Sequence, residues 1–252
     1  MVPYIWIFLT SIKSDSDLFD TPPIIFPANP VFRYADVFFS PKLYYTLTNS
    51  VIVGTITTLA TLAVVIPASY ALVRFRMRGR STLLLLFLVL MLFPPISFLG
   101  YLFNLIRSIG LFDNVFGVIL PYIALSVPLG VWVLTSFIKS VPVELEEAAI
   151  VDGADRLEIL RSIVLPLIGP GIAAAAIIVF ITSWNEFMIA LTLTISRAVT
   201  LPIGIYGFMG VYTMNWGDVA AATIIASLPV VVAAVIAQRL IVRGLTAGAV
   251  KG

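Results

Sequence analysis

The chain has 252 residues, of which 60% are hydrophobic and 11% charged, with a formal net charge of +2 and a mean hydropathy of +1.09. A soluble domain carries roughly 25% charged residues, so this composition indicates one polytopic helical membrane domain in a lipid bilayer and no nucleic-acid partner. Because cysteine and histidine are both absent, disulfides, thiol nucleophiles, imidazole catalysis and soft-metal sites are excluded.

Residues 1–12 are apolar but short. At about 1.5 Å per residue they rise about 18 Å, against a hydrocarbon core of about 30 Å. Three interpretations are open: a signal peptide, an interfacial segment, or the outer half of a first span whose earlier residues are missing. A signal peptide would need a basic leading region and a small-residue cleavage site. We favour a partial first transmembrane helix, because Ser11-Ile12-Lys13-Ser14 ends it as a span reaching water would end. Residues 13–44 then form an external loop.

Five longer apolar stretches reach the length of about 20 residues that a membrane helix needs. In chain order they are Tyr45–Val73, Leu83–Ile106, Phe116–Ile138, Leu167–Leu193 and Asp218–Ile241. Pro94-Pro95 should kink the second stretch or begin a new half-helix there. The predicted fold is therefore all-α, with five full spans plus a partial N-terminal one. The membrane domain covers residues 45–243, and residues 244–252 are a tail.

The basic residues predict the orientation of these spans. Placing the polar stretch at residues 139–166 inside puts ten of the fifteen basic residues inside and five outside. The compact cluster of Arg74, Arg76, Arg78 and Arg80 carries most weight, because short loops dominate topology. We interpret this cluster as a topology anchor rather than a binding patch. The C-terminus then lies on the inside, which is the cytoplasmic face.

The polar stretch at residues 139–166 predicts two short helices around a turn. Pro142 suits a first helical turn, where Glu144, Glu146 and Glu147 complement the helix dipole. Asp152-Gly153 should end this helix, with Gly153 free to take a positive φ.

A second helix is predicted to begin at Asp155, and Glu158 completes a capping-box pattern. Leu157, Leu160 and Val164 share an apolar face, and Pro166 can open the next membrane helix. An amphipathic hairpin on the lipid surface is the alternative, but anionic headgroups would repel its acidic first half.

The same stretch resembles a known family signature. The pattern E-A-A-x3-G-x9-I-x-L-P of binding-protein-dependent ABC importers is matched at every defined position, by Glu147, Ala148, Ala149, Gly153, Ile163, Leu165 and Pro166. Trp184-Asn185-Glu186-Phe187 and the tail Gly244–Gly252 are similar to motifs of the carbohydrate-uptake, maltose-type branch. The resemblance covers nearly the whole chain and departs only at the N-terminus, where most of the first helix is missing.

The resemblance implies a six-helix permease bundle that forms half of a sugar path, with the first helix truncated in this chain. Its cytoplasmic loop docks on an ATPase subunit, and ATP-driven closure of the ATPases alternates the access of the path. The partners implied are a second permease, two ATPase subunits and an extracytoplasmic sugar-binding protein, which Leu201–Trp216 would approach. ATP and Mg would bind to the partner subunits, because this chain has no phosphate loop of the G-x-x-x-x-G-K-[ST] type.

Contacts for docking are predicted at Leu145, Ala148 and Ala149. The small residues Gly169, Gly171 and Ala173–Ala176 either allow close helix packing or simply fill the membrane. Trp184, Asn185 and Glu186 either support the substrate path or close the fourth span. Glu186 is the only ionisable residue within that apolar stretch, near its outer end.

Three other functions are compared with that of a sugar permease. A permease of the same kind for a non-sugar solute fits the same motif. An ion-coupled secondary transporter would usually carry charged residues in mid-membrane and would need no docking loop. An intramembrane enzyme would need a nucleophile with a base, or metal ligands, and the composition leaves neither. We therefore expect a transporter subunit without catalytic residues, cofactor or metal of its own.

Overall fold

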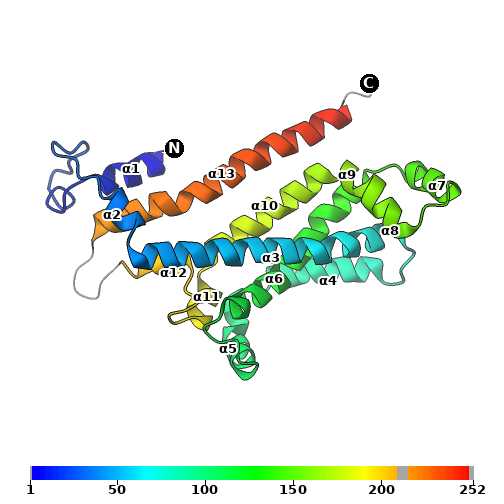
Figure 1. Ribbon diagram of the computed structural model, residues 1–252, viewed down its shortest axis with the longest axis horizontal. Coiled ribbons are helices and arrows are strands. Elements are labelled where there is room, and N and C mark those ends of the chain that lie inside the picture. The colour runs from blue at the N-terminus through cyan, green and yellow to red at the C-terminus, as the bar shows by residue number, and fades with distance from the viewer. Residues whose placement is uncertain (1, 209–214, 250–252) are drawn as a thin grey trace. The chain divides into compact units, whose positions relative to one another are not determined.

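The computed structural model describes residues 2–208 and 215–249, and every regular element in this part of the chain is a helix (Figure 1). The first half contains α1 (Val2–Ser11), α2 (Tyr34–Phe38), α3 (Pro41–Arg74), α4 (Arg80–Leu92), the 3₁₀ helix η1 (Pro95–Phe98), α5 (Leu99–Ser108) and α6 (Val115–Lys139). The second half contains α7 (Val143–Val151), α8 (Arg156–Ile159), the π-helix η2 (Leu160–Val164), α9 (Leu165–Leu167), α10 (Gly169–Asn185), α11 (Met188–Leu193), α12 (Leu201–Tyr206) and α13 (Trp216–Ala249). The predicted all-α class is confirmed.

Within the described residues, three helices are long and apolar enough to cross a membrane, and the number is five if each of two broken helix pairs counts as one span. The single helices are Pro41–Arg74, Val115–Lys139 and Trp216–Ile236. The pairs are Arg80–Leu92 with Pro95–Ser108, and Arg156–Leu167 with Gly169–Asn185. The residues expected to form spans are therefore helical, but two of the five are interrupted.

Several helices begin or end at other residues than the sequence predicted. The fourth apolar stretch is not one helix to Leu193, because α10 ends at Asn185 and α11 begins only at Met188. The predicted tail continues α13 to Ala249, and residues 250–252 lie outside the described residues. The stretch expected as a loop up to residue 44 contains α2, and α3 already begins at Pro41. The loop expected at 201–216 begins with α12, and its residues 209–214 lie outside the described residues.

The chain divides into two compact units, and helices α3, α6, α10 and α13 each contribute residues to both. Unit 1 comprises Met1–Val53, Leu99–Val118 and Trp184–Val232. Unit 2 comprises Gly54–Phe98, Ile119–Ser183 and Ala233–Gly252, and it includes the whole polar stretch of residues 139–166.

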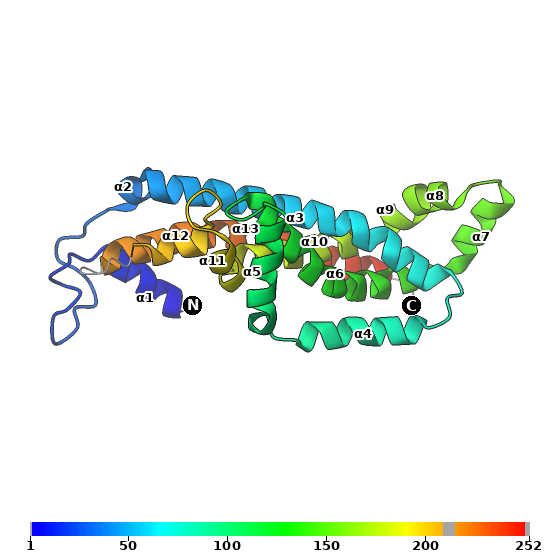
Figure 2. The same cartoon turned by 90° about the horizontal axis from the view of Figure 1, so that it is seen from below.

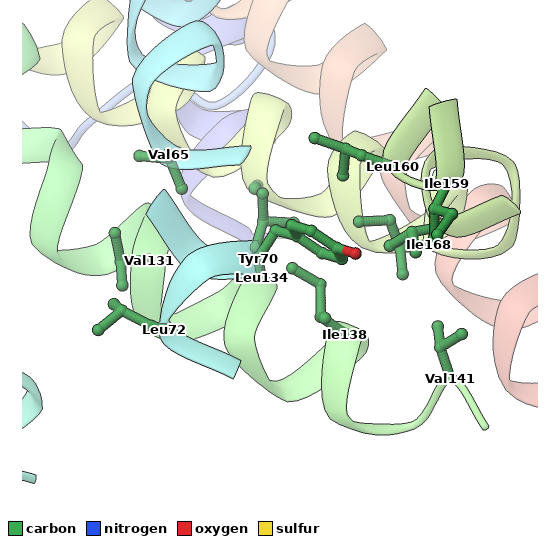
Figure 3. Packing of buried hydrophobic residues seen from close by; sticks show 12 residues of the cluster. Val65, Tyr70, Leu72, Val131, Leu134, Ile138, Val141, Ile159, Leu160 and Ile168 are labelled. Carbon is green, nitrogen blue, oxygen red and sulfur yellow. The ribbon is translucent and has the colours of Figure 1, made fainter. Parts of the chain in front are cut away.

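The core of unit 2 joins the membrane helices to the polar stretch. Figure 3 shows Tyr70 of α3 beside Leu134 and Ile138 of α6, in a cluster that also includes Ile159 and Ile168. An ideal Cβ on Gly171 would lie 2.4 Å from Cγ of Phe137, so α10 and α6 approach closely at this glycine. Close backbone approach maximises the van der Waals contact that holds membrane helices together.

In unit 1, the segment that precedes α12 is fixed to the start of α3. The Asn49 side-chain amide donates to the carbonyls of Arg197 and Val199, both at 3.0 Å. The amide of Leu201 donates to the Ser50 hydroxyl at 2.7 Å. These bonds satisfy polar backbone groups that have no partner within a helix, as a membrane environment requires.

Candidate functional site

The polar stretch of residues 139–166, called the EAA segment below, is a structured element with two helical parts. Helix α7 ends at Val151, and Gly153 takes φ of +91° to reverse the chain. The Asp155 carboxylate then accepts the amide of Glu158 at 2.7 Å and caps α8. The predicted turn and N-cap are therefore confirmed, and Pro142 is the N-cap of α7 rather than its first residue.

The first part is anchored by Glu146, which the sequence grouped with its exposed neighbours. Glu146 is 1% exposed, and one carboxylate oxygen accepts the Tyr70 hydroxyl at 2.9 Å. The other oxygen accepts Nε of Arg74 at 2.6 Å. Arg74 also donates from Nη2 to the carbonyls of Ile138 and Val141, at 3.1 and 2.8 Å. Figure 2 shows α7 beside the C-terminal end of α3.

This anchor changes the interpretation of Arg74. The sequence placed Arg74 with Arg76, Arg78 and Arg80 as a topology anchor, but its side chain is only 9% exposed and pairs with a buried carboxylate. Phe75, the next residue, faces the guanidinium of Arg156 in α8 at 5.9 Å, which is within cation–π range. The residues at the end of α3 thus contact both parts of the EAA segment.

The second helical part of the EAA segment, α8 with η2, packs against the core of unit 2 and contains a π-helical turn. Ile159 and Val164, five residues apart across η2, are both 0% exposed, and Leu160 is 8% exposed. The predicted apolar face is correct for Leu160 and Val164 but wrong for Leu157, which is 52% exposed. A π-helix pairs residues five apart instead of four, and Ile159 and Val164 are buried at that spacing. The helix then bends by 79° before α10 begins at Gly169, so Pro166 lies in α9 and does not open the membrane helix.

The other side of the EAA segment exposes apolar side chains. Val151 is 86% exposed, and Val143, Leu145, Ile150 and Leu157 are between 42% and 52% exposed. A cavity of about 330 Å³ lies beside Gly153, with Ala149 and Ile163 in its wall. An ideal Cβ on Gly153 meets no described atom within 4 Å. The apolar face and the open glycine together form a surface suited to contact with another protein.

The motif residues separate into two sets in the structure. Glu147, Ala148, Gly153 and Pro166 are exposed. Ala149, Ile163 and Leu165 are half-buried and pack against the core of unit 2. The structure therefore brings all seven into one element, in which three support the element and four lie on its outside.

Trp184 and Asn185 line a cavity of about 300 Å³ in unit 1, together with residues of α1, α12 and α13. Trp184 is 3% exposed, and its indole N–H donates to the carbonyl of Ala226 at 3.1 Å. Glu186 does not line this cavity. Its carboxylate accepts the amides of Ile189 and Ala190 at 2.9 and 3.2 Å and so caps α11.

Asp113 fixes the segment that follows α11, and no sequence pattern pointed to it. Its carboxylate accepts the amides of the four consecutive residues 195–198 and the hydroxyl of Ser196. Partial burial opposes ionisation, but these donors outweigh it and hold the pKa of Asp113 well below its usual value. Asp113 itself has φ of +54°, a left-handed conformation that Asp tolerates.

No group of three or more acidic residues suitable for holding a metal ion occurs within the described ranges. What the fold presents instead is a set of apolar helices with one polar element locked onto them. These features define a multi-pass membrane protein with one structured polar element.

Residues 63–247 match the family described as "Binding-protein-dependent transport system inner membrane component". The match covers more than half of the chain, and the chain belongs to this family of inner-membrane permeases, which are components of ABC importers and not enzymes.

Two curated relatives are similar over the full length of the chain. The chain is 38% identical to the trehalose/maltose transport system permease protein MalG of Thermococcus litoralis, over 100% of this chain and 92% of the relative. It is 39% identical to the trehalose transport system permease protein SugB of Mycobacterium tuberculosis, over 100% of this chain and 93% of the relative.

A similar fold occurs in the crystal structure of a bacterial ABC transporter that imports the acidic polysaccharide alginate. The TM-score is 0.80 at 23% identity, over 94% of this chain and 89% of that one. At this identity the likeness concerns the fold alone.

Proposed function

We propose that the chain is the permease subunit of an ATP-driven sugar importer and that its EAA segment faces the cytoplasm and docks on an ATPase subunit. One observation carries the docking: the segment is locked onto the membrane helices on one side and exposes apolar residues on the other. An element that must transmit force needs both properties.

The proposed cargo is a sugar or a glycoside. It rests on the relatives, which are named for trehalose and maltose, trehalose, and sulfoquinovosyl glycerol. The cavity lined by Trp184 and Asn185 suits this class, because an aromatic face with flanking hydrogen-bonding groups such as Thr223 and Ser227 matches a sugar ring. Trp184 and Asn185 are the proposed path residues, with Glu186 as the group that fixes the adjoining turn.

The proposed assembly contains a second permease, two ATPase subunits that bind ATP and Mg, and an external sugar-binding protein. In this arrangement the segment at 201–208 faces the binding protein, and the C-terminus is cytoplasmic. The ATPases drive alternating access by displacing the EAA segments of the two permeases.

Gly153 offers the sharpest test of docking. Gly153→Arg adds a long charged side chain where an ideal Cβ meets no described atom within 4 Å, although φ of +91° strains any residue with a side chain. Gly153→Ala is the matched control, because it carries the same backbone strain without the length or the charge of Arg. We expect Gly153→Arg to lose ATPase co-purification and sugar uptake, and Gly153→Ala to retain both.

Normal assembly and uptake with Arg at this position would contradict docking at Gly153. The cargo is tested separately, by stabilisation of the purified binding protein across a panel that includes trehalose, maltose and non-sugar solutes. If only a non-sugar solute stabilises the binding protein, the proposed sugar cargo is wrong, while the proposed docking on an ATPase subunit still stands.

A further inference from the structure

The acidic residues of α7 differ sharply in their surroundings. Glu144 and Glu147 are exposed, whereas Glu146 is 1% exposed. Successive helical residues are separated by about 100° around the axis, so Glu146 points into unit 2 while its neighbours point outward. A buried carboxylate is tolerated only where donors satisfy it.

The donors for Glu146 come from one face of α3. Tyr70 and Arg74 are four residues apart, and residues at this spacing lie one above the other on a helix. Each binds a different oxygen of the carboxylate, at 2.9 and 2.6 Å. The carboxylate therefore cannot rotate or slide along α3 without losing one of its two partners.

Arg74 extends the connection to the end of α6. Its Nη2 donates to the carbonyls of Ile138 and Val141, which lie at and just beyond the last turn of α6. The final carbonyls of a helix have no partner within it, and a cation is favoured at this end of the helix dipole. One guanidinium thus joins α3, α6 and α7.

This connection is separate from the covalent one. The covalent route from the EAA segment to a membrane helix runs through α9 into α10, across a bend of 79°. A bend between short helices transmits displacement less directly than a buried charged pair, which cannot separate without leaving each charge unpaired in the interior.

We propose that Glu146 and Arg74 are positioning residues that make α7 and the C-terminal ends of α3 and α6 move as one body when the ATPase displaces the EAA segment. The inference rests on the proposed function, because it assigns the route by which docking would reach the membrane helices. Neither residue touches the solute or ATP in this scheme. Their role is to keep hydrolysis coupled to transport.

The first measurement is the number of solute molecules transported per ATP hydrolysed by the complete importer in proteoliposomes. Glu146→Gln keeps the size of the side chain and removes its charge, and we expect the ratio to fall about tenfold while assembly and hydrolysis persist, because Arg74 is left with an uncompensated buried charge. Arg74→Lys keeps the charge but loses the planar guanidinium that reaches three acceptors. Its ratio should therefore lie between those of Glu146→Gln and the unsubstituted complex.

Arg76→Lys is the matched control for Arg74→Lys, because it makes the same change at an exposed position outside the EAA segment. Its ratio should equal that of the unsubstituted complex. A purely structural role would lower transport and hydrolysis together through loss of assembled complex, with an unchanged ratio. That outcome in Glu146→Gln and Arg74→Lys would overturn the proposal.

A second measurement keeps the network intact. The chain has no cysteine, so Glu144→Cys on α7 and Val64→Cys on α3, both exposed, can carry spin labels in a complex whose partners lack reactive cysteines. We expect the same distance between the labels without nucleotide and with ATP and vanadate. A distance that changes between these states would overturn the single-body motion.

The two proposals fail differently. Absence of uptake by the unsubstituted complex for every sugar of the panel contradicts the sugar cargo, whereas the label distances still decide the motion of α7 with α3. Conversely, normal ATP-driven uptake with an unchanged ratio in Glu146→Gln contradicts the positioning role and leaves the importer function standing.

Discussion

At the scale of single residues, Glu146, Asp113 and Glu186 are three of the described carboxylates that accept hydrogen bonds from the protein. Glu146 is satisfied by side chains of α3, whereas Asp113 and Glu186 accept backbone amides. A charged acceptor makes a stronger hydrogen bond than a neutral one. Each carboxylate therefore fixes one segment: Glu146 holds α7, Glu186 holds the start of α11, and Asp113 holds residues 195–198.

Asp113→Asn should loosen residues 195–198 without refolding them. Asn accepts the left-handed φ of this position, but it has one acceptor oxygen where the carboxylate has two. A hydrogen bond to a charged group is worth about 1.5–3 kcal/mol, so we expect amide hydrogen exchange at residues 195–198 to become about tenfold faster or more. Ser196→Ala, which removes only the hydroxyl donor, is the control and should have a smaller effect.

The same prediction has a defined pH dependence. The folded pKa of Asp113 lies below its usual value, and the unfolded value of an Asp is about 3.9. The stabilisation is therefore fully present above the unfolded pKa and is lost as the pH falls through the folded pKa. The ratio of exchange rates between Asp113→Asn and the parent should be the same at pH 6 and pH 8. A ratio that differs between pH 6 and pH 8 would contradict the lowered pKa of Asp113.

At the scale of helices, two glycines near the start of α10 have opposite surroundings. A Cβ on Gly171 would lie 2.4 to 2.8 Å from ring atoms of Phe137, whereas a Cβ on Gly169 meets nothing within 4 Å. The close-packing interpretation of the small residues is thus confirmed for Gly171 and wrong for Gly169.

Gly171→Ala should therefore push α10 away from α6 and lower the stability of the protein. Overpacking of this kind costs about 1–3 kcal/mol, while Gly169→Ala should be neutral or stabilising by up to about 1 kcal/mol, because Ala favours a helix over Gly. The midpoints of thermal unfolding of the two variants in the same detergent check this difference. Equal midpoints would show that the ring of Phe137 moves aside at no cost.

The helix breaks show which local features a sequence can predict. The break at Pro94-Pro95 follows from proline itself, since a proline lacks the amide that a helix interior needs. The break after Asn185 was missed because the apolar composition continues to Leu193, and the cap that makes it depends on a side-chain conformation of Glu186. The π-turn at Leu160–Val164 was also missed, because the predicted apolar face followed ordinary helical spacing through Leu157 and did not include the buried Ile159.

Some features of the candidate site were predicted from the sequence, and others were not. The turn at Gly153 and the cap at Asp155 come from local chemistry, so the spacing of the motif located them. The burial of Glu146 depends on Arg74, which is 72 residues away in the chain. A single sequence contains no signal for that pair beyond an arginine at the end of an apolar stretch. Long-range partners of this kind require the fold.

At the scale of the whole molecule, two sources of energy for transport lead to opposite expectations. An ion-coupled carrier would use a carboxylate that takes up and releases its ion near the middle of the membrane. Glu186 instead accepts two backbone amides at the start of α11 and caps that helix. The EAA segment, by contrast, is a large structured element for which an ion-coupled carrier has no use.

Uptake by the complete importer should therefore depend on ATP and be independent of ion gradients. In proteoliposomes with the ATPases facing the lumen and the binding protein outside, we expect accumulation of labelled sugar with luminal ATP and Mg, unaffected by a protonophore or a sodium ionophore. A proton or sodium gradient without ATP should give no more uptake than liposomes without protein. Luminal ADP with Mg is the matched control, because it occupies the nucleotide sites without supporting hydrolysis. Uptake driven by either gradient in the presence of ADP would contradict the importer and favour the secondary transporter.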